Sequence, residues 1–148
     1  MNAGERNTWV SLCASLTVNA WFGHLVWAMY QSGTHLAPDG LQIWARSMLW
    51  VIPVSIVANI GLTILASIVE GAVTGQPRIL FLKDERDRNF ELHGMGAMIL
   101  MVVMAFLGAM IWLAFGGSAF NAFNLIYLGF FLGDVCNSLV KLGLYRCS

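Results

Sequence analysis

The stretch LHGMGAMILMVVMAFLGAMIWLAF at residues 92–115 contains no Asp, Glu, Lys or Arg, and it decides the class of this protein. A helix that crosses a membrane needs about 20 mostly apolar residues, because each residue rises about 1.5 Å through a hydrocarbon layer about 30 Å thick. Three further stretches, at residues 8–30, 44–70 and 120–144, are also predominantly apolar and long enough. None of them alternates with period two, and a helix satisfies its own backbone hydrogen bonds in lipid. The sequence therefore predicts four transmembrane helices.

The composition of the whole chain excludes an ordinary soluble domain. Its 148 residues are 58% hydrophobic and only 11% charged, with a mean hydropathy of +0.71. Soluble domains contain about 25% charged residues. The formal net charge is zero, so no basic field favours nucleic acid as a partner. We expect one transmembrane domain over residues 1–148, with a charged loop at residues 71–91.

The distribution of basic residues predicts the orientation in the membrane. Cytoplasmic loops carry an excess of Lys and Arg, and here all basic residues except Arg46 fall on one side of the predicted spans. Both termini and the loop at residues 71–91 are then cytoplasmic. The spans form an all-α four-helix bundle of two antiparallel hairpins. The residues on the predicted cytoplasmic side are Arg6, Arg78, Lys83, Arg86, Arg88, Lys141 and Arg146.

The fourth predicted span carries the sharpest candidate site. An ionisable side chain inside the bilayer costs about 2.5–3.5 kcal/mol on insertion scales, so Asp134 is a candidate functional group. At about 100° per residue, Tyr127, Asp134, Asn137 and Lys141 fall within about 80° of one another on one helix face. In the functional interpretation, Asp134 binds a proton or a cation, Asn137 is a neutral ligand and Lys141 supplies a counter-charge.

The same span also has a structural interpretation, in which Asp134 has no binding role. Asp134 would form a hydrogen bond with Asn137, Asn59 or Thr63 and would only fix the packing against a neighbouring helix. Gly129 and Gly133 form a G-x-x-x-G pair, which lets the backbone of another helix approach closely. These two glycines are predicted helix-packing residues.

A second polar group is predicted at the cytoplasmic ends of the second and third spans. Glu70, Glu91 and His93 would form the inner mouth of a proton path that leads to Asp134. Alternatively, these side chains lie among the lipid headgroups, where Glu91 complements the dipole at the start of the third helix.

The histidines invite a haem interpretation, since two histidines on different helices can ligate one iron. The predicted topology argues against it, because His24 lies in the outer half of its span and His93 at the inner edge of another. No histidine–carboxylate spacing typical of a metal site accompanies them. We find no nucleophile–base pair, phosphate-binding loop or paired catalytic carboxylates either. We therefore expect no haem, no metal and no enzymatic activity.

The charged loop carries a resemblance. The run Lys83-Asp84-Glu85-Arg86-Asp87-Arg88, followed by Glu91-Leu92 and a helix rich in Gly, Ala and Met, resembles a broad group of small bacterial membrane proteins of unknown function. These proteins place a D-E-R-[DE]-R segment between two hydrophobic hairpins. The resemblance implies a bacterial inner-membrane protein and supplies no activity.

Two functions remain open from the sequence. The first is a non-enzymatic accessory or assembly subunit that acts by helix–helix association, with itself or with a larger membrane complex. The G-x-x-x-G pair and the lack of an extramembrane domain favour it. The alternative is a small proton- or cation-coupled transporter or channel, working as a dimer, in which Asp134 is the coupling group.

Overall fold

The computed structural model describes residues 3–74 and 85–147, and within them it describes no side chains for residues 3, 70, 73–74 and 85–87. This part of the chain is all-α. Its long helices are α1 (Ala3–Gln31), α2 (Gly40–Thr74), α3 (Glu85–Ala114) and α4 (Ala119–Cys147), and a short 3-10 helix η1 (Thr34–Leu36) lies between α1 and α2. The predicted four-helix fold class is confirmed.

Each of the four long helices is able to cross a membrane. Their apolar stretches run over Gly4–Gln31, Gly40–Val69, Arg88–Ala114 and Ala119–Cys147. At about 1.5 Å per residue, each exceeds the roughly 30 Å hydrocarbon core. The chain is therefore a multi-pass membrane protein.

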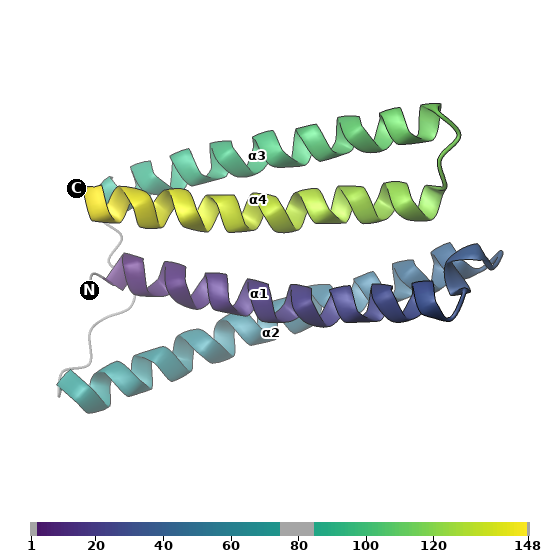
Figure 1. Ribbon diagram of the computed structural model, residues 1–148. Coiled ribbons are helices and arrows are strands. Elements are labelled where there is room, and N and C mark those ends of the chain that lie inside the picture. Colours follow the sequence, from purple (N-terminus) through teal and green to yellow (C-terminus); the bar gives the residue numbers. More distant parts are fainter. Residues whose placement is uncertain (1–2, 75–84, 148) are drawn as a thin grey trace.

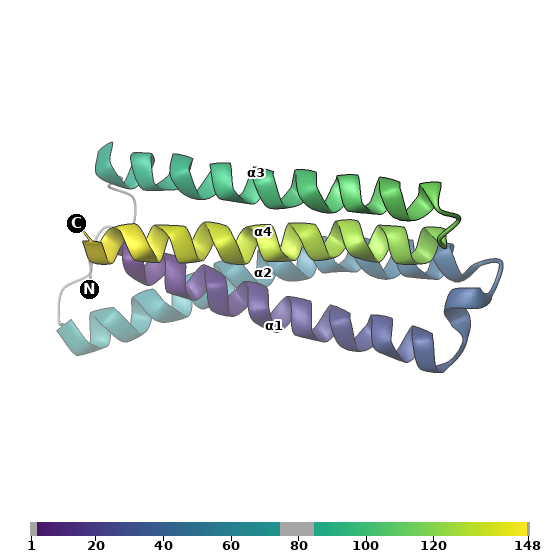
Figure 2. The same ribbon diagram turned by 45° about the horizontal axis from the view of Figure 1, so that its top comes forward.

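The helices form two antiparallel hairpins that pack side by side (Figures 1 and 2). Helix α4 lies in the middle, with α3 along one side and α1 along the other, while α2 packs mainly against α1. Both chain termini lie at one end of the bundle, which we call the terminal end. The α1–α2 and α3–α4 connections lie at the other, the turn end. Toward the terminal end, α2 diverges from α1 in both views.

Glycines make both turns possible. Gly33 and Gly116 have φ angles of 74° and 81°, in the left-handed region that other residues rarely adopt. After Gly116, Ser118 immediately precedes α4, and its Oγ accepts a hydrogen bond from the Asn121 amide at 3.3 Å. The α3–α4 connection is consequently short, and the two helices stay in contact.

Small residues join α3 to α4. A Cβ on Gly129 would overlap the Ala105 Cβ, and one on Gly133 would lie 3.1 Å from Met98 Cγ. Helices in lipid gain no hydrophobic free energy from association, so close van der Waals contact of this kind holds them together.

A compact apolar cluster joins α1, α2 and α4 toward the turn end. It comprises Val18, Phe22, Trp44, Val51 and Phe120, each at most 7% exposed. The rings of Phe22 and Trp44 meet edge to face with centroids 6.0 Å apart, and the Trp44 Nε1–H donates to Asn124 Oδ1 at 2.9 Å. We call this group the aromatic cluster. It packs α1, α2 and α4 together on the turn side of the bundle.

Candidate functional site

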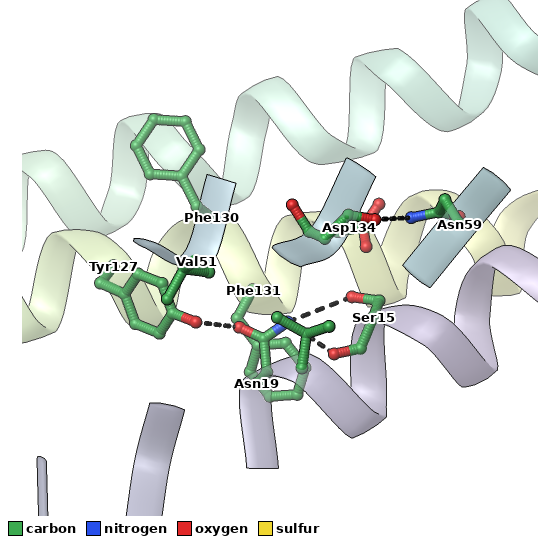
Figure 3. A pocket seen from close by; sticks show the side chains of 10 residues that line it. Ser15, Asn19, Val51, Asn59, Tyr127, Phe130, Phe131 and Asp134 are labelled. Carbon is green, nitrogen blue, oxygen red and sulfur yellow. Dashed lines mark hydrogen bonds between the residues drawn. The ribbon is translucent and has the colours of Figure 1, made fainter. Parts of the chain in front are cut away.

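A cavity of about 230 Å³ lies among α1, α2 and α4, directly beside the aromatic cluster (Figure 3). Val18, Val51, Phe130 and Phe131 form its apolar walls. Its polar lining comes in pairs, one pair from each helix: Ser15 and Asn19, Ser55 and Asn59, and Tyr127 and Asp134.

The cavity lies near the middle of the membrane. Asp134 is adjacent to the midpoint of α4, and Ser55 and Asn59 lie on either side of the midpoint of α2. Asn19 is within one turn of the midpoint of α1. Because all three helices cross the bilayer, these polar groups lie at about the depth where polar side chains are most costly.

One hydrogen-bonded chain connects α4 to α1 at this depth. The Tyr127 hydroxyl donates to Asn19 Oδ1, as Figure 3 shows. The Asn19 Nδ2 in turn donates to the Ser15 carbonyl oxygen at 2.7 Å and approaches Ser15 Oγ at 3.3 Å. The Tyr127 ring packs against the Phe22 ring, with centroids 4.4 Å apart. The Tyr127 hydroxyl and the Asn19 amide are thus held in fixed positions.

A polar stripe follows α2 from the cavity toward the terminal end. Ser55, Asn59, Thr63 and Ser67 recur every four residues and are half-buried. Each side chain donates to a carbonyl oxygen of its own helix, for example Asn59 Nδ2 to Ser55 O at 3.2 Å and Thr63 Oγ1 to Asn59 O at 2.7 Å. We call these four residues the α2 stripe. Their oxygens remain able to accept further hydrogen bonds.

Asp134 is the acidic residue of the cavity lining. It is half-buried, and within residues 3–74 and 85–147 its carboxylate has no hydrogen-bond or ion-pair partner. No Lys or Arg of this described part lines the cavity. An uncompensated negative charge in apolar surroundings is costly, so Asp134 is the candidate residue of this cavity for binding a positive charge.

The predicted polar face of α4 is divided between two neighbours. Tyr127 and Asp134 line the cavity, whereas Asn137 and Lys141 lie against α3 at Gly94. A Cβ on Gly94 would overlap Asn137 Oδ1 and would lie 3.1 Å from Lys141 Cε. Asn137 Oδ1 is buried and has no hydrogen-bond partner in the described part of the chain. The structure therefore brings two of the four predicted residues into one site. The predicted packing glycines, Gly129 and Gly133, both lie in the α3–α4 contact.

The predicted cytoplasmic mouth is described only in part. The Glu70 side chain lies outside the described residues. On α3, Glu91 is half-buried, and His93 is exposed with its Nδ1 2.8 Å from the Asn89 carbonyl oxygen. Both α3 residues lie on the terminal side of the cavity, and Glu91 is about two helical turns along α3 from Met98, which packs against Gly133 beside Asp134.

The histidines do not share a site. His24 is exposed on α1 toward the turn end, and His93 begins the span of α3 at the terminal end. His35 of η1 packs against the Tyr30 ring, with centroids 4.6 Å apart. The described residues contain no group of three or more His, Cys, Asp or Glu side chains that could hold a metal ion.

Sequence reasoning did not select Ser15, Asn19 or Ser55 as site residues, and it named Asn59 only as a packing partner. Their signal was present, because polar residues separated by four positions in an apolar helix lie on one face. Which helices share an interior with that face depends on the tertiary arrangement, which the sequence pattern does not specify.

Comparison of this chain with protein families, with curated proteins and with solved structures finds no match. The candidate function consequently depends on the geometry of the cavity.

Proposed function

We propose that this chain is a small proton- or cation-coupled membrane transporter in which Asp134 binds a proton and a cation in turn. The supporting observation is a carboxylate that has no counter-charge among the described residues, in a cavity near the middle of the membrane. An uncompensated charge at this depth costs about 2.5–3.5 kcal/mol on insertion scales. Proton and cation compete for the same oxygens, and competition of this kind couples their movements.

The different residues on the two sides of the cavity support transport over static binding. On the turn side, the aromatic cluster covers the cavity with side chains that are almost fully buried, such as Phe22 and Trp44. On the terminal side, the α2 stripe continues from Ser55 to Ser67, and α1 and α2 diverge (Figure 1). We propose that the α2 stripe forms the route toward one side and that the aromatic cluster closes the other side, as alternating access requires of one state.

We propose the bacterial inner membrane as the location, on the resemblance carried by residues 83–92. We propose cytoplasmic N- and C-termini from the distribution of Lys and Arg. The α2 stripe would then lead to the cytoplasm. Reporter fusions at each terminus test the orientation: activity of a cytoplasmic reporter at both ends is expected, and ends on opposite faces would contradict it.

The transport assay uses the purified chain in proteoliposomes with a pH-sensitive dye inside and an imposed pH gradient. Addition of a permeating cation should move protons in the opposite direction. Asp134→Asn keeps the size of the side chain but removes the charge, so coupled flux should fall to the level of empty liposomes.

Asp39→Asn is the matched control. It removes the same charge from an exposed residue in the connection between α1 and α2, and its flux should equal that of the unmodified protein. Undiminished flux in Asp134→Asn would refute the transport role of Asp134.

A second candidate, the accessory or assembly subunit, is supported by the outward face of α1. Exposed residues of α2 and α3 are mainly Ile, Leu, Val and Met, as lipid requires, but α1 exposes Thr17, His24 and Gln31. Ionisable residues in spans usually face protein or water. This difference favours contact of α1 with another helix, in an oligomer or a larger complex.

A pair of substitutions tests the association. His24→Trp should disrupt assembly through α1, while Ile60→Trp on the lipid-facing side of α2, where Ile60 is 56% exposed, should leave it intact. Native mass spectrometry of the protein extracted from its own membrane reports the assembly. A monomer without partners would contradict the accessory role.

A further inference from the structure

We propose that the cavity selects a small organic cation that carries N–H donors, a primary ammonium ion, over metal cations and over quaternary ammonium ions. This inference rests on the proposed function, because it names the class of cation that Asp134 exchanges for a proton.

The hydrogen bonds of the lining decide what the ligand must provide. The Tyr127 hydroxyl, the Asn19 amide, the Asn59 amide and the Ser55 hydroxyl all donate to oxygens of the protein. The Asp134 carboxylate has no donor from the described part of the chain, and Asn59 Oδ1 receives none there. The lining thus presents the Asp134 carboxylate and Asn59 Oδ1 as acceptors without donors, while the Tyr127 and Ser55 hydroxyls and the Asn19 amide already donate to the protein; the Ser15 hydroxyl and the second Asn59 N–H remain as donors.

A ligand pairs with such a lining by donating. A primary ammonium ion has three N–H donors and a positive charge, so it satisfies the Asp134 carboxylate and the Asn59 carbonyl together. A quaternary ammonium ion has the same charge but no N–H group, and it would leave these acceptors without hydrogen bonds in a region where unmet acceptors are costly. An anion would be repelled by Asp134.

The size of the cavity and its supply of oxygen ligands favour a small organic cation over a dehydrated metal ion. One water molecule takes up about 30 Å³, so 230 Å³ holds a ligand of only a few heavy atoms, smaller than the drug-sized ligands of pockets of about 300–1,000 Å³. A Ca²⁺ ion needs about 6–8 oxygen ligands. The polar side chains supply fewer oxygens that are not already bonded. Val18, Val51 and Phe131 instead offer an apolar wall for an alkyl chain.

Binding is then a balanced exchange. The ammonium ion enters as the Asp134 carboxyl group releases its proton to water, and the carboxylate forms an ion pair with the ammonium group. One positive charge enters the site and one leaves it. Each cation bound therefore releases up to one proton to the medium.

The experiment compares two isomers, butylammonium and tetramethylammonium, which have the same molecular formula and charge but differ in N–H donors. The full-length chain in detergent micelles, in weakly buffered solution, is titrated with each probe and with Na⁺, and released protons are measured. We expect butylammonium to bind about tenfold tighter than tetramethylammonium or Na⁺. Asn59→Leu should remove most of that preference.

Thr63→Val is the matched control, because Thr63 is the next residue of the α2 stripe but does not line the cavity; its preference should be unchanged. Equal or tighter binding of tetramethylammonium or Na⁺, or a preference that survives Asn59→Leu, overturns the inference and leaves the proposed function standing. If no probe releases protons, or Asp134→Asn releases as many, the proposed function fails as well. If Asn59→Leu does not fold, the comparison of the two isomers on the unmodified chain still tests whether the cavity prefers a primary ammonium ion.

Discussion

Replacement of Gly129 by Ala tests whether close contact holds α3 against α4. The added Cβ would overlap the Ala105 Cβ, and Ala105 Cα is only 3.6 Å away, so no flexible side chain is able to yield and α3 must shift. Overpacking of this kind costs about 1–3 kcal/mol. The change from Gly to Ala also favours any helix by about 1 kcal/mol, which partly hides the cost.

Gly143→Ala separates the two contributions. Gly143 lies in the same helix, but a Cβ there would have no atom within 4 Å. Both variants gain the same helix propensity, so their difference isolates the clash. We expect Gly129→Ala to be less stable than Gly143→Ala by about 1–3 kcal/mol, a factor of about 5–160 in the unfolding equilibrium.

The assay is reversible unfolding by SDS in mixed micelles, followed by the fluorescence of the six Trp residues. Gly143→Ala should unfold at the same SDS fraction as the unmodified protein or a higher one. Equal stabilities of the two variants would refute the packing of α3 and α4 described above.

Three further variants test other parts of the structure. Asn137→Leu removes the buried Oδ1 that has no partner in the described chain. It should raise stability by about 1 kcal/mol in SDS unfolding and leave cation flux unchanged. A loss of flux would show that Asn137 takes part in cation binding. Tyr127→Phe removes the hydrogen bond to Asn19 and should lower the stability by about 0.6 kcal/mol in SDS unfolding. An unchanged stability would mean that this hydrogen bond is absent in the membrane. Gly116→Ala forces a side chain into a φ of 81° and should destabilise the α3–α4 turn by about 1 kcal/mol or more, whereas equal stability would contradict the turn geometry.

The spans could be predicted from the sequence because hydropathy reports contact with hydrocarbon. The ends of the helices could not. The second span was expected at residues 44–70, but α2 runs from Gly40 to Thr74, and α3 begins at Glu85 although its apolar run starts at residue 92. Helices continue past the hydrocarbon as long as backbone hydrogen bonding continues, and charged residues at a helix end are compatible with water there.

The sequence could predict only those site residues that lie together on one helix. Helical periodicity correctly places Tyr127 and Asp134 on one face of α4, but an arc of about 80° is wide enough to touch two neighbours. Asn137 lies toward Gly94 of α3, while Asp134 lies toward α1 and α2. The partners of Asp134 in the cavity come from other helices, and the choice of neighbouring helices is set by packing that no local pattern encodes.

Infrared difference spectroscopy of the chain in lipid, recorded before and after addition of butylammonium, tests the central claim most directly. If Asp134 exchanges a proton for a cation, the carbonyl band of a protonated carboxyl group should disappear as a carboxylate band grows, and neither change should occur in Asp134→Asn. A spectrum without loss of a protonated carboxyl band, or with the same loss in Asp134→Asn, would contradict the exchange.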